Sequence, residues 1–201
     1  MKLYFAQNSR AVRTAWLLEE LGLDYELERF KLGDKAMRDP EYLAKNPNGR
    51  VPVLEDGDVR ITESTAIAQY LVGRYGNGRF APPVESPEFP VYLQWLHYAE
   101  GMIMMPMGQI VVETILLPPE RRSEEHAKRA TKLLGRMLVA VDAHMDGRAY
   151  LAGDFTAADT ITGHAVLMCR RLGANMDGMD NLTTYMARLE ARPALQKAFA
   201  L

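Results

Sequence analysis

Strand-like sequence is confined to roughly the first third of this chain, and the rest has helical periodicity almost throughout. Short runs in which apolar and polar residues alternate end near Thr62, and none recurs beyond Pro87. Such a change predicts two domains, because a sheet built from the early strands cannot continue into the later helices. A chain of 201 residues is long enough to give each of two small domains its own core.

The first part of the chain predicts the element order β-α-β-(α)-β-β-α. Its strands and two main helices are expected, in chain order, at 3–5, 10–21, 25–30, 51–54, 59–62 and 64–75. The first two strands are joined through a helix and should be parallel, whereas the last two flank turn residues and should form an antiparallel hairpin. We therefore predict an α/β domain with a mixed four-stranded sheet.

The second part predicts an all-α helical bundle. Its helices are expected at 88–116, 119–145, 156–172 and 179–190, with a short closing turn after Pro193. The stretch 76–83 is the richest in glycine and proline and is the natural linker. We place the domains at 1–77 and 86–201.

The composition narrows the possible partners and compartments. With 24 basic and 26 acidic residues the net charge is −2, so no basic excess favours nucleic acid or an anionic membrane. No apolar run reaches the roughly 18 residues of a membrane span, and the N-terminus lacks the pattern of a secretory signal. The single cysteine, Cys169, excludes an internal disulfide, and a cytoplasmic location is expected.

The segment from Asn46 to Pro52 is the most informative in the chain. A proline cannot donate to a sheet ladder, so Pro52 either begins a strand or follows a cis peptide. A cis peptide would leave the backbone of Val51 free to pair with an extended peptide, as an added strand does. Both interpretations are open on this evidence alone.

The pair Glu63-Ser64 stands where the helix at 64–75 begins. Ser64 could simply cap this helix, with Glu63 as a solvated acid. A helix N-terminus also favours anions, and Glu63 could pair with an ammonium group at the same place. An α-amino acid carries both of these charged groups.

Taken together, these features resemble the glutathione S-transferase family of the cytosolic, bacterial type. The resemblance rests on the βαβ-ββα order, Asn-Pro-x-Gly-Arg-Val-Pro before the hairpin, Glu-Ser after it, and the helical remainder, and it covers nearly the whole chain. It implies a thioredoxin-like N-terminal domain that binds glutathione and a C-terminal helical domain that supplies a hydrophobic site. It also implies a homodimer in which the N-terminal domain of one subunit meets the helical domain of the other.

The resemblance assigns roles to individual residues. The backbone of Val51, set by cis-Pro52, would pair with the cysteinyl unit of glutathione. Glu63 and Ser64 would hold its γ-glutamyl end, and Arg50 would face its glycine carboxylate. The implied activity is attack by the glutathione thiolate on a hydrophobic electrophile in detoxification, with glutathione as co-substrate and no metal.

The group that ionises the thiol is less clear. A thiol of pKa near 8.5 is mostly protonated at pH 7, and one good hydrogen-bond donor before the first helix would favour the thiolate. Related transferases carry a serine where this chain has Ala6. We therefore expect Ser9 first and Asn8 second as the donor, and Tyr4, which lies within a strand, as a weaker candidate. Ser9 could instead only cap the helix.

The methionine-rich segment of residues 102–107 is the candidate wall of the hydrophobic site. Methionine accepts varied apolar shapes, although each of these residues could be ordinary core. Tyr98, Met102 and Met105 fall on one predicted helical face and are expected to line the electrophile pocket. His97 and His164 have no partners at metal-ligand spacing.

Two alternatives remain open. Because the usual serine is missing, the chain could reduce disulfides or peroxides with glutathione instead of forming thioethers. It could also be a non-catalytic protein that keeps the fold and binds glutathione or another ligand without activating a thiol.

Overall fold

The computed structural model describes residues 1–201, which form two compact units. The first unit comprises Met1–Ala81 together with Glu190–Leu201, and the second comprises Pro82–Leu189.

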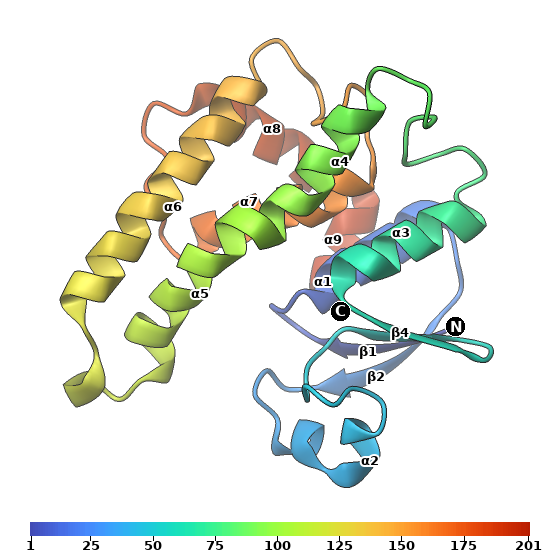
Figure 1. The fold of residues 1–201 in the computed structure, drawn as a ribbon, viewed down its shortest axis with the longest axis horizontal. Coiled ribbons are helices and arrows are strands. Elements are labelled where there is room, and N and C mark those ends of the chain that lie inside the picture. The colour runs from blue at the N-terminus through green and yellow to red at the C-terminus, as the bar shows by residue number, and fades with distance from the viewer. The chain divides into compact units, whose positions relative to one another are not determined.

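The first unit is built on a four-stranded sheet with the strand order β2-β1-β3-β4 (Figure 1). The strands are β1 Lys2–Ala6, β2 Glu26–Phe30, β3 Val53–Asp56 and β4 Val59–Thr62. β1 is parallel to β2, and the pairs β1·β3 and β3·β4 are antiparallel. Gly57, at φ 60, begins the two-residue turn of the hairpin, where a residue with a side chain would be strained. The predicted mixed sheet is confirmed.

Two helices cover one face of this sheet. Helix α1 spans Ala11–Leu21 and ends at Gly22, as predicted, and α3 spans Ser64–Tyr75. In Figure 1 both lie above the sheet, and α1 contacts both β1 and α3. Nearly every residue of α1 is buried, including Arg13 and Thr14. Helix α1 is thus the centre of the unit rather than a surface layer.

The opposite face is covered by the segment between β2 and β3. It contains one 3₁₀ turn, η1 Lys35–Arg38, and the short helix α2 Pro40–Leu43, which Figure 1 shows below the sheet. Because side chains alternate along a strand, the paired residues Tyr4 and Val53 turn to this side. They form a small core with their neighbours, which are Met37, Tyr42, Phe30 and Val51.

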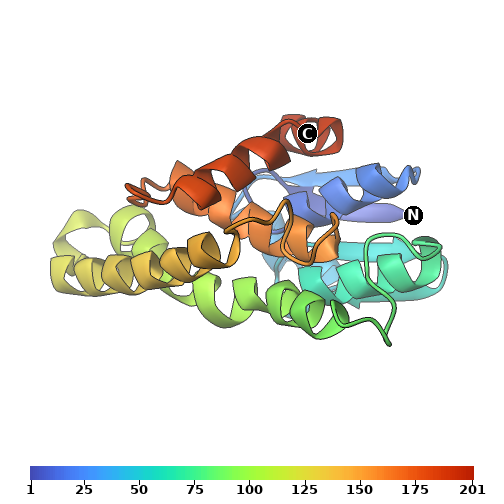
Figure 2. The ribbon, with the colours of Figure 1, turned by 90° about the horizontal axis from the view of Figure 1, so that it is seen from above.

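The last helix, α9 Pro193–Ala200, belongs to the first unit although the sequence analysis assigns it to the second domain. It packs along α1, and Figures 1 and 2 show the two side by side. The Arg192 guanidinium donates to both carboxylate oxygens of Glu20 at 2.6 and 2.7 Å. Lys197 pairs with Glu19 at 2.6 Å. These contacts join segments that are far apart in sequence, so no short stretch of sequence predicts that α9 belongs to the first unit.

The named elements of the second unit are all helical, as predicted, and two isolated β-bridges lie in the loop 150–154. Its elements are α4 Phe89–Tyr98, η2 Ala99–Ile103, α5 Met104–Val111, η3 Val112–Leu116, η4 Pro119–Arg121, α6 Glu124–His144, η5 Asp159–Gly163, α7 His164–Arg171 and α8 Asp180–Glu190. α5 packs along α6, and the two lie side by side in Figures 1 and 2.

The long helix predicted at 88–116 contains two π-helical turns, η2 and η3. η2 ends where Met104 donates to the carbonyl of Ala99, five residues back. Pro106 follows, and a proline can neither donate to the helix ladder nor tolerate an undistorted preceding turn. A wider turn before the proline accommodates it, so the helix stays nearly continuous.

The core of the second unit is the segment formed by η5 and α7. Thr162 fastens it to α4 by donating to the carbonyl of Trp95 at 2.5 Å and accepting from the Ala99 amide at 3.1 Å. Gly163 has no room for a side chain, since a Cβ would lie 2.4 Å from a methyl carbon of Leu189. A side chain here would force Leu189 and Tyr185 to shift within the core, so the packing favours glycine.

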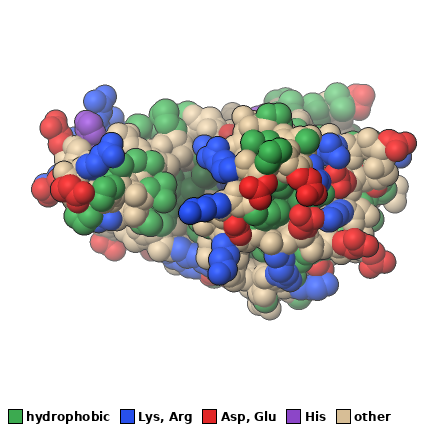
Figure 3. Space-filling view, turned by 90° about the horizontal axis from the view of Figure 1, so that it is seen from below, with side chains coloured by type: hydrophobic (Ala, Val, Ile, Leu, Met, Phe, Trp, Pro, Cys, Tyr) green, Lys and Arg blue, Asp and Glu red, His purple; other side chains and the backbone are tan.

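Exposed apolar side chains collect on the second unit. Large hydrophobic residues of its helices that remain exposed are Met102, Met105, Val112, Ile115, Leu116 and Val139. Figure 3 shows hydrophobic side chains gathered on the left of the view, over the end of this unit that holds α5 and the start of α6. No helix is both long and apolar enough to span a membrane.

Candidate functional site

The predicted site residues of the first unit gather at one end of its sheet. Val53 pairs with Thr62 in the hairpin and with Tyr4 of β1. The residues just before Val53 therefore lie beside those just after Thr62, and both lie at the end where β1 leaves the sheet. This register brings together the segment 50–52, the pair 63–64 and the loop 7–10, which are far apart in sequence.

The Val51–Pro52 peptide is cis, in agreement with the expectation for this segment. β3 begins only at Val53, and the backbone amide of Val51 donates to no other residue of the chain. Across from it, Phe5 and Ala6 pair with β2 but not with β3. The backbone at this end of the sheet is thus open to an extended ligand.

The N-terminus of α3 has an unusual backbone. Glu63 adopts φ 67 and ψ 111, a strained conformation for a residue with a side chain. It occupies the N-cap position, so Ser64 is the first helical residue and not the cap. The Glu63 side chain is exposed, whereas Ser64 is 3% exposed. The first amides of α3 have no partner within the helix, so a negative charge at this end of α3 would be stabilised.

Arg13, which no motif in the sequence marks as a site residue, reaches this helix end from α1. Its side chain is 0% exposed, and its guanidinium donates to the Ser64 hydroxyl at 3.2 Å. A buried cation next to a helix N-terminus adds to the positive potential there, so the site favours an anion. The one sequence feature that could have indicated the role of Arg13 is its position as a charged residue within the apolar helix predicted at 10–21.

Arg50 presents its side chain to solvent. The side chain forms no hydrogen bond or ion pair with another residue, so it can reach toward a ligand or remain solvated. Its backbone carbonyl, in contrast, accepts two hydrogen bonds from buried side chains.

The hydroxyl of Ser9 is already engaged at the start of α1. It donates to the carbonyl of Ala6 at 2.6 Å and accepts from the amide of Ala11 at 3.1 Å. The bond from the Ala11 amide makes a local serine turn just before the N-cap of α1, which is Arg10. To donate to a sulfur atom, Ser9 would first have to give up the bond to Ala6.

Asn8 has the opposite character. Its side chain is exposed and bonds to no other residue, and its backbone lies in the left-handed region at φ 59. Asparagine tolerates this conformation better than most residues. Its amide group is therefore available as a donor at the end of β1.

Tyr4 is a core residue. Its side chain is 1% exposed and its hydroxyl donates to Glu55 at 3.0 Å. Burial and this hydrogen bond to a carboxylate raise the pKa of Tyr4 to about 12. The hydroxyl is directed at Glu55 on the neighbouring strand.

The residues predicted to line the electrophile pocket lie in different surroundings within the second unit. The Tyr98 hydroxyl donates to the Met137 carbonyl of α6 at 3.1 Å, and its ring packs against Trp95 with centroids 4.6 Å apart. Met102 and Met105 are 41% and 65% exposed. The π turn η2 separates Tyr98 from Met105, so regular helical spacing does not hold between them.

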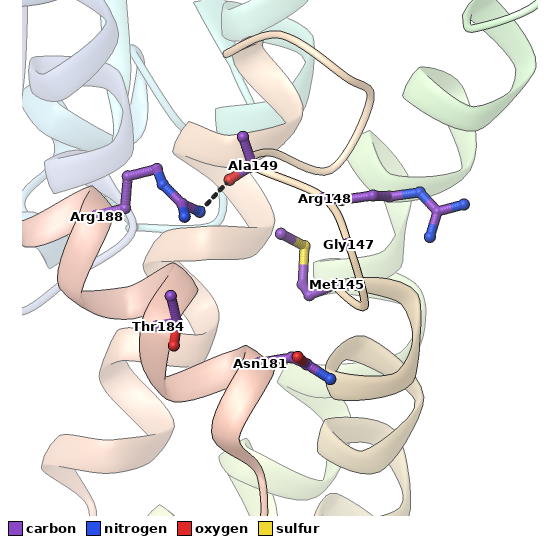
Figure 4. Close-up of a pocket in the computed structure, with 7 residues that line it drawn as sticks. All are labelled: Met145, Gly147, Arg148, Ala149, Asn181, Thr184 and Arg188. Carbon is purple, nitrogen blue, oxygen red and sulfur yellow. Dashed lines mark hydrogen bonds between the residues drawn. The ribbon is translucent and has the colours of Figure 1, made fainter.

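The cavity drawn in Figure 4 contains none of the predicted site residues. It has a volume of about 390 Å³ and lies between the loop after α6 and the first turns of α8. Arg188 donates to the carbonyl of Ala149 at 2.6 Å, while Arg148 extends away from the hollow. The two guanidinium groups therefore do not converge on a common anion.

The histidines and the cysteine considered in the sequence do not form a metal site. The structure contains no group of three histidine, cysteine or acidic residues that could hold a metal ion. His97 is exposed and His164 is buried in the core of the second unit. The buried Cys169 thiol contacts the sulfur of Met107 at 3.7 Å.

Comparison with known proteins identifies the family. The glutathione S-transferase N-terminal domain matches residues 1–73, and the glutathione S-transferase C-terminal domain matches residues 103–193. The chain is also 31% identical over 195 residues to glutathione S-transferase 4 of Zea mays, covering 92% of this chain and 85% of that relative. This chain belongs to the glutathione S-transferase family.

Other members of the glutathione S-transferase family support the same assignment. Glutathione S-transferase GstB of Escherichia coli is 28% identical over 200 residues, covering 97% of this chain and 95% of the relative. A glutathione transferase homolog from Lodderomyces elongisporus, solved with two GSH per subunit, superposes with a TM-score of 0.90 at 25% identity. That match covers 99% of this chain and 97% of the other.

Proposed function

We propose that this protein binds glutathione at the open end of its N-terminal sheet and transfers the thiolate to hydrophobic electrophiles. One observation carries the proposal: the unpaired backbone at Val51 and the N-terminus of α3, which has a positive potential, lie at the same end of the sheet. The edge at Val51 suits the cysteinyl unit, which pairs as a short strand. The α3 N-terminus with Ser64 suits the γ-glutamyl carboxylate, and Glu63 suits the adjacent ammonium. Arg50 remains our choice for the glycine carboxylate.

The reaction needs little beyond positioning and ionisation. The thiol of glutathione loses its proton to solvent, the sulfur forms a bond to the electrophilic carbon, and the leaving group departs with the electron pair of its former bond. A donor that stabilises the thiolate lowers the pKa of the thiol. We propose Asn8 and Ser9 for this role, and the free amide of Asn8 supports it over the engaged Ser9 hydroxyl.

For the second substrate we propose a site that includes Tyr98, Met102 and Met105. The exposure of the two methionines supports contact with an apolar ligand. We also propose a cytoplasmic homodimer. Light scattering on a sizing column measures its mass. The proposed domains of each subunit are 1–77 and 86–201, and the second ends in α9, which packs back on α1.

Calorimetry with glutathione tests the binding, and absence of heat at millimolar glutathione rejects the proposal. Parallel assays with a chloronitrobenzene, a hydroperoxide and a mixed disulfide then identify the chemistry. Reduction without conjugation would favour the reductase or peroxidase alternative, for which Ala6 in place of the usual serine is the motivating feature. Tight binding with an unshifted thiol pKa would favour a non-catalytic binding protein.

A further inference from the structure

We propose that Tyr42 and Asn46 are positioning residues that aim the Val51 amide at the ligand by holding the carbonyl of Arg50. The inference rests on the proposed glutathione site and adds two residues that do not touch the ligand themselves.

The contacts on the Arg50 carbonyl are direct. The Tyr42 hydroxyl donates to this oxygen at 2.8 Å, and the Asn46 side-chain amide donates to it at 2.7 Å. The two donors are 4% exposed each. A carbonyl oxygen has two lone pairs, so this pair of donors satisfies it completely.

Peptide planarity carries this restraint to Val51. The Arg50–Val51 peptide is trans, since the chain's one cis bond is the next one. In a trans peptide the carbonyl and the following amide point in opposite directions within one plane. The amide of Val51 therefore points away from Tyr42 and Asn46, and it donates to no residue of the chain.

Each donor is itself held in place. The Tyr42 ring packs edge-on against Tyr4 and Phe30, with centroids 5.8 and 5.0 Å away. Burial raises the pKa of Tyr42 to about 12, so the hydroxyl keeps its proton at any working pH. The carbonyl oxygen of the Asn46 side chain accepts from the Asn48 amide at 3.1 Å, which orients its amide nitrogen toward Arg50.

Gly49 lets the chain turn back so that Arg50 meets Asn46. It adopts φ +58, and a Cβ here would lie 2.6 Å from the carbonyl oxygen of Met37. The amide of Gly49 also donates to the Asn46 carbonyl at 2.8 Å. The segment 46–51 is thus a rigid loop, and a preorganised donor loses less entropy when a ligand binds.

The test compares two substitutions with a matched control. Tyr42→Phe removes one donor and keeps the ring, and Asn46→Asp removes the other donor while keeping the acceptor for Asn48. Tyr70→Phe is the control, because it also removes a tyrosine hydroxyl bonded within the first unit, at 2.8 Å to Asp56. Calorimetry measures the Kd for glutathione, and NMR relaxation measures the order of the Val51 amide without ligand.

We expect each of the two variants to raise the Kd about three- to tenfold, the effect of one net hydrogen bond. The Val51 amide should become less ordered in both, whereas Tyr70→Phe should change neither quantity. Tyr42→Phe is the cleaner variant, because a carboxylate at position 46 also repels the carbonyl.

Unchanged affinity and order in Tyr42→Phe would overturn the inference. So would an equal loss of affinity in Tyr70→Phe, which would mean that general stability is responsible. If the unaltered protein fails to bind glutathione, the proposed function is rejected, and the ligand-free order of Val51 still decides whether the two donors hold this peptide.

Discussion

The guanidinium of Arg13 lies 3.2 Å from the hydroxyl of Ser64, and both side chains are almost fully buried. They come from α1 and α3, so the bond links the two helices that cover one face of the sheet. It also sets a fixed positive charge at the N-terminus of α3. Electrostatic interactions are stronger in such a place because little water screens them.

Arg13→Met should therefore weaken glutathione binding about tenfold, since losing a positive charge beside a partly buried anion site costs about 1 to 2 kcal/mol. Folding stability should also fall, by about 1 to 3 kcal/mol, because the buried Ser64 hydroxyl loses the hydrogen bond from Arg13. Calorimetry and urea unfolding measure the two effects. Arg13→Lys, which keeps the charge, should lose less affinity, and equal losses in both variants would contradict the electrostatic explanation.

Ser9→Ala and Asn8→Ala should separate a structural role at the start of α1 from thiol activation. Ser9→Ala should lower the free energy of unfolding by about 1 kcal/mol, because the Ser9 hydroxyl makes two local hydrogen bonds. Asn8→Ala should leave stability nearly unchanged and raise the pKa of bound glutathione by about one unit, or about 1.4 kcal/mol. The ultraviolet absorbance of the thiolate follows that pKa. A raised pKa in Ser9→Ala alone would make Ser9 the activating residue.

Asp159 should make stability depend on pH. It is 0% exposed, and burial raises its pKa from 3.8 to about 6 in spite of hydrogen bonds from Leu151, Thr156 and Tyr185. Between these two values the folded state keeps a proton that the unfolded state has released. The contribution of Asp159 to the free energy of unfolding therefore falls by roughly 2 to 3 kcal/mol as the pH rises from about 4 to about 6.

Urea unfolding across this range measures the effect, with Asp159→Asn as the reference because it cannot titrate. The difference in unfolding free energy between the native protein and this variant should shrink as the pH rises. A difference that stays constant would show that the carboxyl does not titrate in that window.

Met105→Ala should affect the hydrophobic substrate and little else. Its side chain is 65% exposed, so unfolding free energy should change by less than about 0.5 kcal/mol. The KM for an apolar electrophile should rise a few-fold, while the Kd for glutathione stays the same. Val139→Ala, at a site on α6 that is 55% exposed, is the control and should leave both constants unchanged. Equal KM values for Met105→Ala and the native protein would remove Met105 from the pocket.

The strands and the main helices of the first unit could be predicted because their signals are local. Gly22 ended α1, turn residues marked the hairpin, and alternation set which strand residues face the core. The cis bond before Pro52 was one of two open interpretations, and the resemblance favoured the one that the structure has. These features depend on neighbouring residues, and short stretches of sequence specify them.

Other features could not be read in this way. The hydroxyl of Ser9 bonds to Ala6 because of how the chain bends at the end of β1, and residue types do not specify that bend. The π turn before Pro106 shifts the faces of the helix, so a regular period assigned Tyr98 and Met105 to one side. Arg13 meets Ser64 across two helices, and no spacing along the chain predicts that meeting.

The position of helix α9 in the first unit affects the order in which the two units can finish folding during synthesis. The apolar side of α1 is closed off by residues 190–201, which leave the ribosome after the entire helical unit. Until then the side of α1 that packs against α9 is uncovered, and Glu20 lacks the guanidinium of Arg192. The first unit can therefore be complete only after residues 190–201 have been made, and the helical unit is an insertion between its two segments.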